Sequence, residues 1–574
     1  MASPPLPRPL VADGGLAARW QAQPSWTVLD TAFATLGNFF RCRHTWQQAP
    51  LRPRVLHYVG LLEAHQLDGL PDLAQALCES ESAWRPLWAD IAPQLKGLSA
   101  GQHRLLLQNG ALSLTLCVGP LATLLGEQQL FADTVYLGHA EAPLDTWQLK
   151  ALARCCRRGA RIVAANANCL SPGAMAETGF VDLETTGGLA FTVFNPHWRT
   201  EARDALSAIT PPTRCIVVGA GLAGASVAQA LALRGWQVTV LDRQPQAAHG
   251  ASGLPVGLVV PHRSADDSPR SRLSRVGAHL TLQHARKHLQ AGQDWYASGV
   301  QEMDVPAQTS HWHADAAWIR PAQLVQAWLK HPNIGCRFGT AVAQLERGQQ
   351  VWLLKDAQGQ LLAEAEQVVF ANATASVPLL LAPPHLAYLG EGVAERLATL
   401  HAVHGTVSYA PHQAPPPAHW PTPPVNGHGY FVPQVPLNGA LSWLVGSTFE
   451  PDRIPEQPCH ALMPLDDQHR ANAQRLSTLL PAVGMDVNHA FADLSVSHWS
   501  STRCVSHDRL PLVGPLDDGP SPSLWLHTAL GARGLSFSAL GAELLAARLG
   551  AEPWPVQTSL ARSLDLRRPK RKRG

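Results

Sequence analysis

Residues 215–244, CIVVGAGLAGASVAQALALRGWQVTVLDRQ, constrain the fold of this chain more than any other segment. A short apolar run breaks at Gly219, Gly221 and Gly224, which have GxGxxG spacing, and passes into an Ala/Leu-rich stretch. A second apolar run then ends on Asp242. A strand, a glycine turn, a helix, a second strand and a terminal acid in this register are typical of a Rossmann unit that binds a dinucleotide.

Each glycine of this unit has a physical role. Gly219 permits the tight turn, Gly221 lets a pyrophosphate approach the backbone, and Gly224 lets the helix pack close to the strand. The free N–H groups at the helix start would meet the phosphates, and Asp242, about 20 residues past the glycines, would hold a ribose. GxGxxG alone is a weak signal, but the flanking strands and the acid make this one specific.

Three further segments indicate that the dinucleotide is FAD. They resemble the flavin-binding segments of the D-amino-acid oxidase and glycine oxidase superfamily. The first is a loop of small residues with one hydroxyl, the second reads strand–hairpin–strand over 341–373, and the third is a glycine turn before a helix near 535. The resemblance implies that these residues contact the cofactor: Ala251, Ser252, Gly253, Val342, Ala371, Gly531, Arg533, Gly534 and Leu535.

In that superfamily the backbone near Val342 would face the adenine, and Ala371 would close the Rossmann half. The start of the helix after Leu535 would face the flavin pyrimidine and stabilise the anionic reduced ring. The alternative is a Rossmann domain that binds NAD alone.

Composition places the chain among cytosolic enzymes rather than secreted or membrane proteins. The 574 residues predict several domains, and a net charge of +2 gives no global field that would attract a polyanion. The ten cysteines show neither CxxC pairing nor metal-ligand spacing, so we expect reduced thiols and no metal. We also expect no signal peptide and no membrane span.

The chain divides into a separate α/β unit over residues 1–200, a linker over 201–213, an FAD-dependent oxidoreductase over 214–558 and a basic tail over 559–574. In the first unit we expect strands at 27–29, 54–59, 134–137 and 161–165, helices near 72–78 and 146–157, and a hairpin over 103–119. The Pro-rich residues 409–427 are expected to connect two strands at the surface. The last residues, RRPKRKRG, are either a solvated terminus or a tether for RNA phosphates.

An α/β unit in front of such an FAD block resembles the bacterial MnmC family of tRNA-modifying proteins. The resemblance runs through the whole C-terminal block, for example in WIRPAQLVQAWL at 318–329, HGTVSY at 404–409, LVGSTFEPD at 444–452 and RCVSHDRLPLVGP at 503–515. It implies an α/β fold class: a class I methyltransferase-like Rossmann domain followed by a Rossmann-type FAD-binding domain with an α+β substrate domain, as in D-amino-acid oxidase.

The same resemblance implies a function in modifying uridine 34 of tRNA, recognised through the anticodon loop. The oxidoreductase would remove the carboxymethyl group from 5-carboxymethylaminomethyl-(2-thio)uridine as glyoxylate and leave 5-aminomethyl-(2-thio)uridine. The N-terminal domain of the family adds a methyl group from S-adenosylmethionine.

Two residues are candidates for the oxidoreductase site. Arg503 lies where the superfamily commonly keeps an arginine that forks onto the substrate carboxylate with two charge-assisted bonds. A structural ion pair with Asp508 is the alternative role for Arg503. Tyr430 would cover the substrate or pack in the core, and Arg533 is a second candidate for the carboxylate if it does not serve the flavin.

The N-terminal block departs from the family pattern at its cofactor turn and its catalytic strand. Ala32, Ala34 and Leu36 stand where the family has glycines, and Leu36 should fill space that S-adenosylmethionine needs. Gly138 stands where the family has an Asp, although Glu141 or Asp145 could be recruited in its place. We therefore expect a degenerate methyltransferase that keeps its fold, with impaired binding of S-adenosylmethionine.

Three alternatives stay open at the level of sequence. The chain could be the full bifunctional enzyme that also methylates the aminomethyl group. It could be a small-molecule amine oxidase of the glycine or sarcosine type. Or it could be a non-catalytic RNA-binding flavoprotein.

Overall fold

A computed structural model describes residues 16–21, 23–95, 97–138, 143–198, 209–451, 462–493, 495–519 and 521–569. The chain forms two compact units. The N-terminal unit comprises Met1–Pro212, Leu233–Gly235 and Ala546–Arg562, and the C-terminal unit comprises the rest. Most of the expected linker, the last five residues of the basic tail and Glu141 lie outside the described residues.

An eight-stranded sheet forms the centre of the N-terminal unit, in the order β3-β4-β2-β1-β5-β6-β8-β7. Strands β4, β2, β1, β5 and β6 are parallel, whereas β3 and the β7/β8 pair run antiparallel to their neighbours. The strands are β1 (Ser25–Asp30), β2 (Val55–Leu62), β3 (Gly101–Leu107), β4 (Leu112–Val118), β5 (Ala132–Leu137), β6 (Cys156–Ala164), β7 (Phe180–Thr186) and β8 (Leu189–Phe194). The strand order reverses at β1 and β5, which is where α/β sheets bind ligands.

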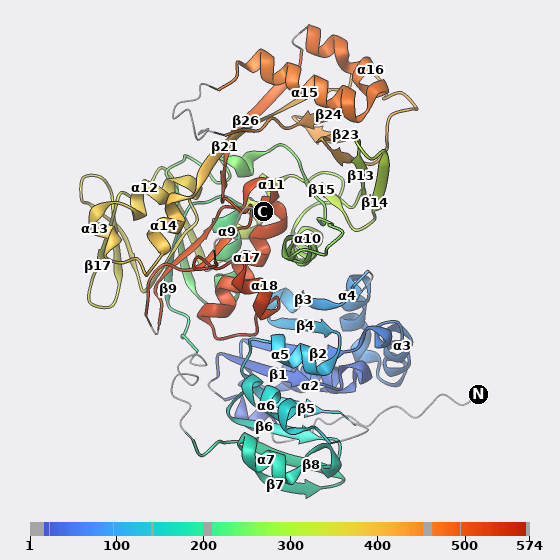
Figure 1. Cartoon of the computed structure of the whole chain (residues 1–574), viewed down its shortest axis with the longest axis vertical. Helices are drawn as coiled ribbons and strands as arrows, with labels where there is room; N and C mark the ends of the chain where they lie inside the picture. Colours follow the sequence, from blue (N-terminus) through green and yellow to red (C-terminus); the bar gives the residue numbers. More distant parts are fainter. Residues whose placement is uncertain are drawn as a thin grey trace. The chain divides into compact units, whose positions relative to one another are not determined.

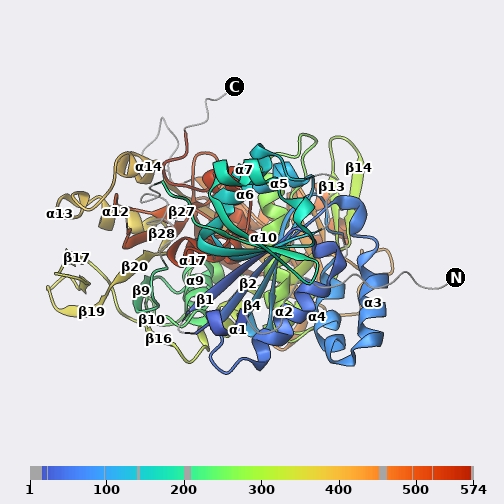
Figure 2. The same ribbon diagram turned by 90° about the horizontal axis from the view of Figure 1, so that it is seen from below.

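Helices cover both faces of this sheet. Figure 2 shows α5 (Leu121–Glu127), α6 (Thr146–Cys155) and α7 (Pro172–Thr178) on one side and α2 (Gly37–Gln48) on the other. Helices α3 (Leu70–Ser80) and α4 (Arg85–Leu95) complete the connection from β2 to β3. β1, β2 and β4 are buried along almost their whole length, as expected for parallel strands covered on both faces. This arrangement confirms the class I methyltransferase-like fold that we expected.

The expected elements of the N-terminal unit are present, with one correction. The hairpin over 103–119 is the β3/β4 pair, in which Leu107 lies opposite Leu112. The helix expected over 146–157 ends at Cys155 instead, because Cys156 already pairs with Ala132 of β5. Strand β6 therefore begins five residues earlier than the sequence pattern predicted.

The C-terminal unit is built on a six-stranded sheet in the order β16-β10-β9-β20-β28-β27, parallel except for β27. Its strands are β9 (Arg214–Val218), β10 (Gln237–Leu241), β16 (Ile334–Arg337), β20 (Gln367–Phe370), β27 (Leu512–Pro515) and β28 (Leu524–Thr528). Helices α9 (Leu222–Leu233) and α17 (Gly534–Leu549) follow β9 and β28, and the Oγ of Ser226 donates to the carbonyl of Ser538 at 3.1 Å. This is the Rossmann-type sheet that the glycine motif predicts.

A second large sheet of the same unit has the order β14-β13-β22-β23-β24-β21-β25, with β26 paired to β21. Its strands are β13 (Val300–Asp304), β14 (Thr309–His313), β21 (His401–Pro411), β22 (Val425–Gly427), β23 (Gly429–Leu437), β24 (Ala440–Gly446), β25 (Glu450–Pro451) and β26 (Ser497–Val505). Helices α15 (Leu465–Leu479) and α16 (Pro481–Ala492) lie over β23 and β24 (Figure 1). The Pro-rich segment connects β21 to β22, as expected.

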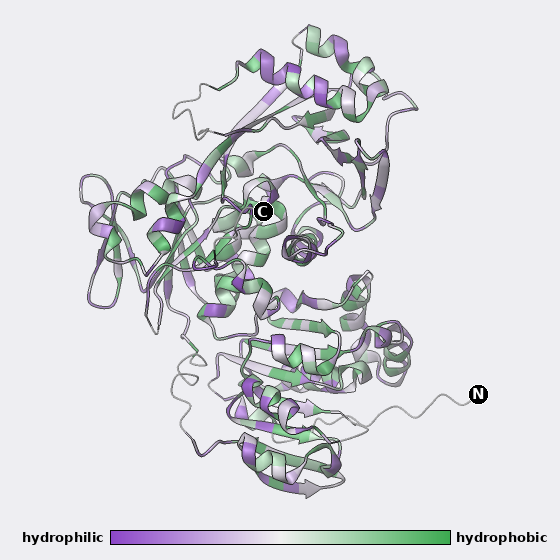
Figure 3. Cartoon of the chain, viewed as in Figure 1, coloured by the Kyte–Doolittle hydropathy of each residue, from purple (hydrophilic) through white to green (hydrophobic). Residues whose placement is uncertain are grey.

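Two small three-stranded sheets complete the unit: β11 (Gly257–Val259), β12 (Trp295–Tyr296) and β15 (Ala317–Ile319) in one, and β17 (Gln344–Arg347), β18 (Trp352–Lys355) and β19 (Leu361–Ala365) in the other. The long helix α10 (Pro269–His288) and α11 (Pro321–Leu329) pack together. Figure 3 shows apolar residues along the central strands and polar residues on outer helices such as α15. Within the described residues, no helix combines the length and the apolarity that crossing a membrane requires.

Candidate active site

A cavity of about 1770 Å³ lies in the C-terminal unit, between the Rossmann-type sheet and the second large sheet. Segments far apart in the sequence meet here. Every site residue predicted from the sequence lines it except Gly224 and Gly253: Gly219, Gly221, Asp242, Ala251, Ser252, Val342, Ala371, Tyr430, Arg503, Gly531, Arg533, Gly534 and Leu535.

The glycine turn lies at one end of this cavity. Gly219 has a φ of +113°, and a Cβ there would stand 2.7 Å from the carbonyl oxygen of Ala371. Both carboxylate oxygens of Asp242 accept backbone N–H groups, from Ala220 at 2.6 Å and from Gln244 at 2.8 Å. The acid thus stabilises the turn while it borders the cavity, where a ribose could reach it.

The start of helix α9 forms a cradle for a phosphate group. The backbone N–H of Leu222 donates to the Oγ of Ser252 at 2.8 Å, and a Cβ on Gly221 would stand 3.0 Å from that same oxygen. Only a glycine keeps this approach open, and an anion beside Leu222 would meet the positive end of the helix. The cradle fits the pyrophosphate of FAD.

Gly224 and Gly253 act behind the cavity wall. A Cβ on Gly224 would overlap the carbonyl of Gly219, so the residue allows the helix to pack close to the strand. A Cβ on Gly253 would stand 2.6 Å from the carbonyl oxygen of Ala248 and 3.5 Å from the Nε1 of Trp499.

The other two flavin-type segments reach the cavity from the carboxyl ends of β20 and β28. The N–H of Ala371 donates to the carbonyl of Val218 at 2.8 Å, which joins the second segment to the first. Gly531 has a φ of +56° and begins the turn that leads into α17. The start of α17 therefore lies at the cavity, as the resemblance implies.

Arg503 projects from β26 into the cavity wall. Its Nη2 donates to the carbonyl of Thr448 at 3.0 Å and to the Oγ of Ser447 at 3.4 Å, and its guanidinium lies 4.3 Å from the ring centroid of Phe449. Burial lowers the pKa of the guanidinium, which nevertheless stays charged because arginine starts so high. The cation is held in place by neutral groups.

The alternative role of Arg503, an ion pair with Asp508, is not what the structure shows. Asp508 pairs with Arg568 instead, through Oδ1–Nη2 and Oδ2–Nε contacts of 2.7 and 2.8 Å. Burial favours the neutral acid, but the bonds and the charge of Arg568 outweigh it and lower the pKa of Asp508. Arg567, the first residue of RRPKRKRG, likewise pairs with Asp518 of the C-terminal unit.

Tyr430 lies on β23 and also borders the cavity. Its hydroxyl donates to the carbonyl of Val256 at 3.1 Å. Burial raises the pKa of Tyr430, and the positive charge of Arg503 partly opposes this effect. The phenol is therefore neutral, and it lies close enough to Arg503 for the charge of the guanidinium to affect its pKa.

Three of the cavity residues that the sequence did not identify lie near the predicted ones. Phe449 is half exposed and stacks on Arg503, Trp499 lines the wall near Gly253, and Gly405 leaves room for the Arg503 side chain. Phe449 and Gly405 belong to the motifs LVGSTFEPD and HGTVSY, which carried the family resemblance. The glycine within HGTVSY was the available signal for a close approach.

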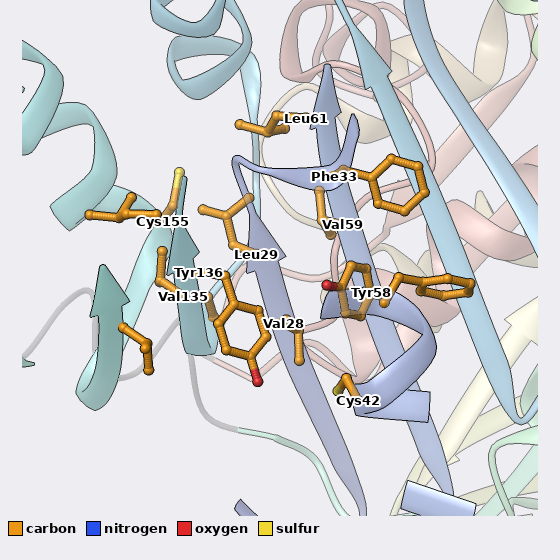
Figure 4. Packing of buried hydrophobic residues seen from close by; sticks show 14 of the residues in the cluster. Val28, Leu29, Phe33, Cys42, Tyr58, Val59, Leu61, Val135, Tyr136 and Cys155 are labelled. Atoms are coloured by element: carbon orange, nitrogen blue, oxygen red, sulfur yellow. The ribbon is translucent and has the colours of Figure 1, made fainter. Parts of the chain in front are cut away.

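In the N-terminal unit, the turn after β1 is packed shut. Phe33 and Leu36 are each only 2% exposed, and Leu36 has a φ of +55°, a conformation that favours glycine. Figure 4 shows Phe33 close to Tyr58 and Val59 of β2. Gly138 offers no room for a ligand group either, because a Cβ there would stand 2.7 Å from that of Ala32.

The acid at the end of β1 is also engaged in hydrogen bonds within the protein. Asp30 accepts hydrogen bonds from the Tyr58 hydroxyl at 2.6 Å, from the N–H of Ala32 at 2.8 Å and from the Nδ2 of Asn38 at 3.3 Å. Complete burial raises the pKa of Asp30 to about 6 despite these bonds.

Comparison with known proteins identifies the class and the family. The family model DAO, FAD dependent oxidoreductase, matches residues 214–305 and 282–548, so the C-terminal unit is an FAD-dependent oxidoreductase of this class. The tRNA 5-methylaminomethyl-2-thiouridine biosynthesis bifunctional protein MnmC of Albidiferax ferrireducens is 42% identical, over 96% of this chain and 94% of its own. The MnmC protein of Polaromonas sp. (strain JS666) is 40% identical, over 96% of this chain and 92% of its own.

The chain belongs to the MnmC family, as the sequence motifs indicated. Among solved structures, glycine oxidase from Geobacillus kaustophilus covers 58% of this chain and 94% of its own, with 16% identity and a TM-score of 0.45.

Proposed function

We propose that this protein oxidises the 5-carboxymethylaminomethyl group of (2-thio)uridine 34 in tRNA and leaves a 5-aminomethyl group. The cationic Arg503 in the wall of a flavin-type cavity is the observation that carries this proposal. Among the described residues its hydrogen-bond partners are a carbonyl and a hydroxyl, so its charge is available for a substrate carboxylate. As a tRNA-modifying enzyme it would act in the cytoplasm, without a membrane partner.

The chemistry needs a bound carboxylate, a neutral amine and a hydride acceptor. FAD, when bound at the glycine turn and at the start of α17, supplies the acceptor. The substrate amine carries a CH2–COO⁻ group, whose carbon loses a hydride while the nitrogen loses a proton. Water then adds to the resulting C=N bond and cleaves it, which releases glyoxylate and the aminomethyl product.

The residues of the cavity bind and orient this group. Arg503 forks onto the carboxylate and thereby fixes the position of the adjacent carbon. Tyr430 stays neutral near Arg503, so it adds no competing negative charge to the carboxylate site. We assign the remaining cavity residues predicted from the sequence, except Arg533, to the binding of FAD, together with Gly224 and Gly253 behind them.

The word bifunctional in the names of the relatives favours a second candidate, in which the N-terminal unit also methylates the product with S-adenosylmethionine. We propose instead that this unit no longer binds that cofactor. Phe33 and Leu36 occupy the space beside β1 and β2, and the cofactor turn lacks the glycines that would let a ligand lie on its backbone.

Nucleoside mass spectrometry tests both parts of the proposal. The purified FAD-containing protein is given S-adenosylmethionine and tRNA that carries 5-carboxymethylaminomethyl-uridine. We expect 5-aminomethyl-uridine and glyoxylate in equal amounts. Formation of 5-methylaminomethyl-uridine would establish the bifunctional enzyme, and unchanged tRNA with rapid turnover of glycine or sarcosine would establish a small-molecule amine oxidase.

A matched pair of variants tests the role of Arg503. Arg503→Lys keeps the positive charge but loses the fork, so we expect KM to rise less than in Arg503→Gln. FAD content and the flavin spectrum serve as controls. Equal activity of all three proteins would contradict the assignment.

A further inference from the structure

Two arginines from separate segments line the cavity, and a third lies beside a histidine of the cavity wall. Arg533 and Arg509 line it, from the turn before α17 and from the connection between β26 and β27. Arg270, in the first turn of α10, reaches His262, which also lines the cavity. The β26–β27 connection and the α17 turn therefore present positive charge to the cavity, and helix α10 adds a cation next to His262.

Within the part of the chain that the structure describes, no carboxylate forms a hydrogen bond or an ion pair with these three side chains. The Nη2 of Arg270 donates to the Nε2 of His262 at 3.0 Å. Among the described residues, the side chains of Arg509 and Arg533 make neither a hydrogen bond nor an ion pair. The carboxylate that faces Arg533 is Glu302, which is already bonded to the Nε2 of His313 at 2.7 Å.

His262 is uncharged and therefore does not neutralise these arginines. Its Nδ1 lies 2.7 Å from the Oγ of Ser271. Burial, Arg270 and Arg533 lower the pKa of His262 to about 4, against the weaker effects of Glu302 and Asp266. The imidazole is therefore neutral near pH 7 and accepts the Arg270 hydrogen bond.

The arrangement is electrostatically unfavourable without an anion. Burial first, then the neighbouring charges of Arg270 and Arg509, lower the pKa of Arg533. Like charges at the wall of a cavity attract a negative ligand, and guanidinium groups fit the oxygens of a phosphate.

The positions of these arginines differ from those of the groups that would meet the substrate carboxylate and the FAD phosphates. Arg503 lies on β26, where it donates to the carbonyl of Thr448. Arg509 lies on the connection after β26, and Arg533 lies in the turn before α17. The pyrophosphate cradle lies at the start of α9. These arginines are therefore available to a third anionic group, and an RNA substrate carries one on each side of the modified nucleoside.

We propose that Arg270, Arg509 and Arg533 bind a backbone phosphodiester next to the modified uridine, so that the cavity selects a polynucleotide over a free nucleoside. This inference rests on the proposed function. It assigns the recognition of RNA to the oxidoreductase cavity itself rather than to the basic C-terminus alone.

The test compares two substrates of the full-length, FAD-containing protein: an anticodon stem-loop RNA with 5-carboxymethylaminomethyl-uridine, and the corresponding nucleoside. Arg270→Gln and Arg509→Gln remove one cation each, and Arg470→Gln on α15, outside the cavity, is the matched control. We expect KM for the RNA to rise about tenfold in Arg270→Gln and in Arg509→Gln, because each loses a charge-assisted bond. KM for the nucleoside and flavin reduction at saturating RNA should not change.

The salt dependence gives a second readout. The slope of log KM against log salt should fall by about 0.7 for each lost contact to a single strand. Equal losses for RNA and nucleoside would assign the arginines to the substrate carboxylate, and no loss for either would remove them from binding; both results overturn the inference.

A chemical substitution in the RNA keeps the test valid if the nucleoside is not oxidised. RNAs with one uncharged methylphosphonate linkage beside the modified uridine should bind the unsubstituted protein more weakly, and Arg509→Gln should not weaken them further. If the effects of the methylphosphonate and of Arg509→Gln on binding are additive at both neighbouring linkages, the phosphate contact is refuted. Failure of the unsubstituted protein to oxidise any RNA would instead refute the proposed function.

Discussion

Gly405 of β21 makes room for the guanidinium of Arg503 on β26, because any Cβ at position 405 would overlap the Nη2 of that arginine. The two strands pair antiparallel, with Val403 opposite Arg503, so the arginine side chain extends back along its neighbour strand. The position of the cation thus depends on a missing side chain two residues further along β21.

We expect Gly405→Ala to displace Arg503 and to raise KM for the modified RNA by tenfold or more, in line with a lost charge-assisted fork of about 1.5–3 kcal/mol. Binding of FAD should be unaffected, because the glycine cradle is untouched. Steady-state kinetics and FAD content check this. Gly335→Ala is the control, since a Cβ there meets nothing within 4 Å, and equal effects of the two variants would contradict the role of Gly405.

The cradle at the start of α9 predicts a different phenotype for Gly221. In Gly221→Ala the new Cβ stands 3.0 Å from the Oγ of Ser252, in the space where the pyrophosphate approaches the backbone. We expect FAD affinity to fall by about tenfold or more, with KM for RNA unchanged in the fraction that retains FAD. Fluorescence titration of the apoprotein with FAD measures this. An unchanged affinity would place the pyrophosphate elsewhere.

The sequence predicts the flavin-type half of the site well because its determinants are local. The glycine turn, Ser252 and Asp242 lie within about 35 residues, and their roles follow from strand–turn–helix geometry. The neighbours of Arg503 could not be predicted in this way, since Gly405 and Phe449 reach it only through the pairing of distant strands.

Ion pairs between residues far apart in the sequence could not be predicted either. The sequence offers Asp508 as a possible partner of Arg503, five residues away. In the structure Asp508 pairs with Arg568, sixty residues further along the chain. By contrast, the prediction that Leu36 fills space agrees with its burial, because a large side chain replaces a glycine within one short turn. The sequence therefore predicts local backbone requirements, but it does not predict ion-pair partners that lie far apart in the chain.

The buried carboxyl of Asp30 predicts a stability that decreases as pH rises through the range from 3.8 to about 6. Its pKa is raised in the folded chain, so the folded state binds the proton more tightly than the unfolded state does. The free energy of unfolding should fall by about 3 kcal/mol over this window from Asp30 alone, at 1.36 kcal/mol per pKa unit. Asp30→Asn, which carries no titrating group, should lack this component.

Hydrogen exchange at the amides of β1 and β2 measures the effect in the intact chain. Between pH 4 and pH 7.5, amide protection in Asp30→Asn should increase relative to protection in the unsubstituted protein. A difference that does not vary with pH would show that Asp30 titrates normally. Asp145→Asn, at the exposed cap of α6, is the control for a general effect of removing an acid from this unit.

Within the N-terminal unit, Glu552 predicts the opposite pH dependence. Burial disfavours its charge, but Arg234, whose Nε lies 2.8 and 2.9 Å from the two carboxylate oxygens, and His57 at 3.5 Å outweigh this and lower the pKa of Glu552 to about 2. The stability from this carboxylate is therefore present above pH 4.5 and is lost as pH falls from 4.5 toward 2.

Glu552→Gln should destabilise the protein by about 3–5 kcal/mol at pH 7, because Arg234 keeps its charge in a buried site. Glu366→Gln, which affects an exposed pair with Arg214, should cost no more than about 1 kcal/mol. If the loss arises from an uncompensated charge, the double variant Arg234→Met, Glu552→Leu will be more stable than Glu552→Gln alone. Hydrogen exchange in β2 and in residues 546–562 distinguishes the cases: similar loss of protection in the single and double variants would mean that the ion pair itself, rather than the avoidance of a buried lone charge, stabilises this part of the unit.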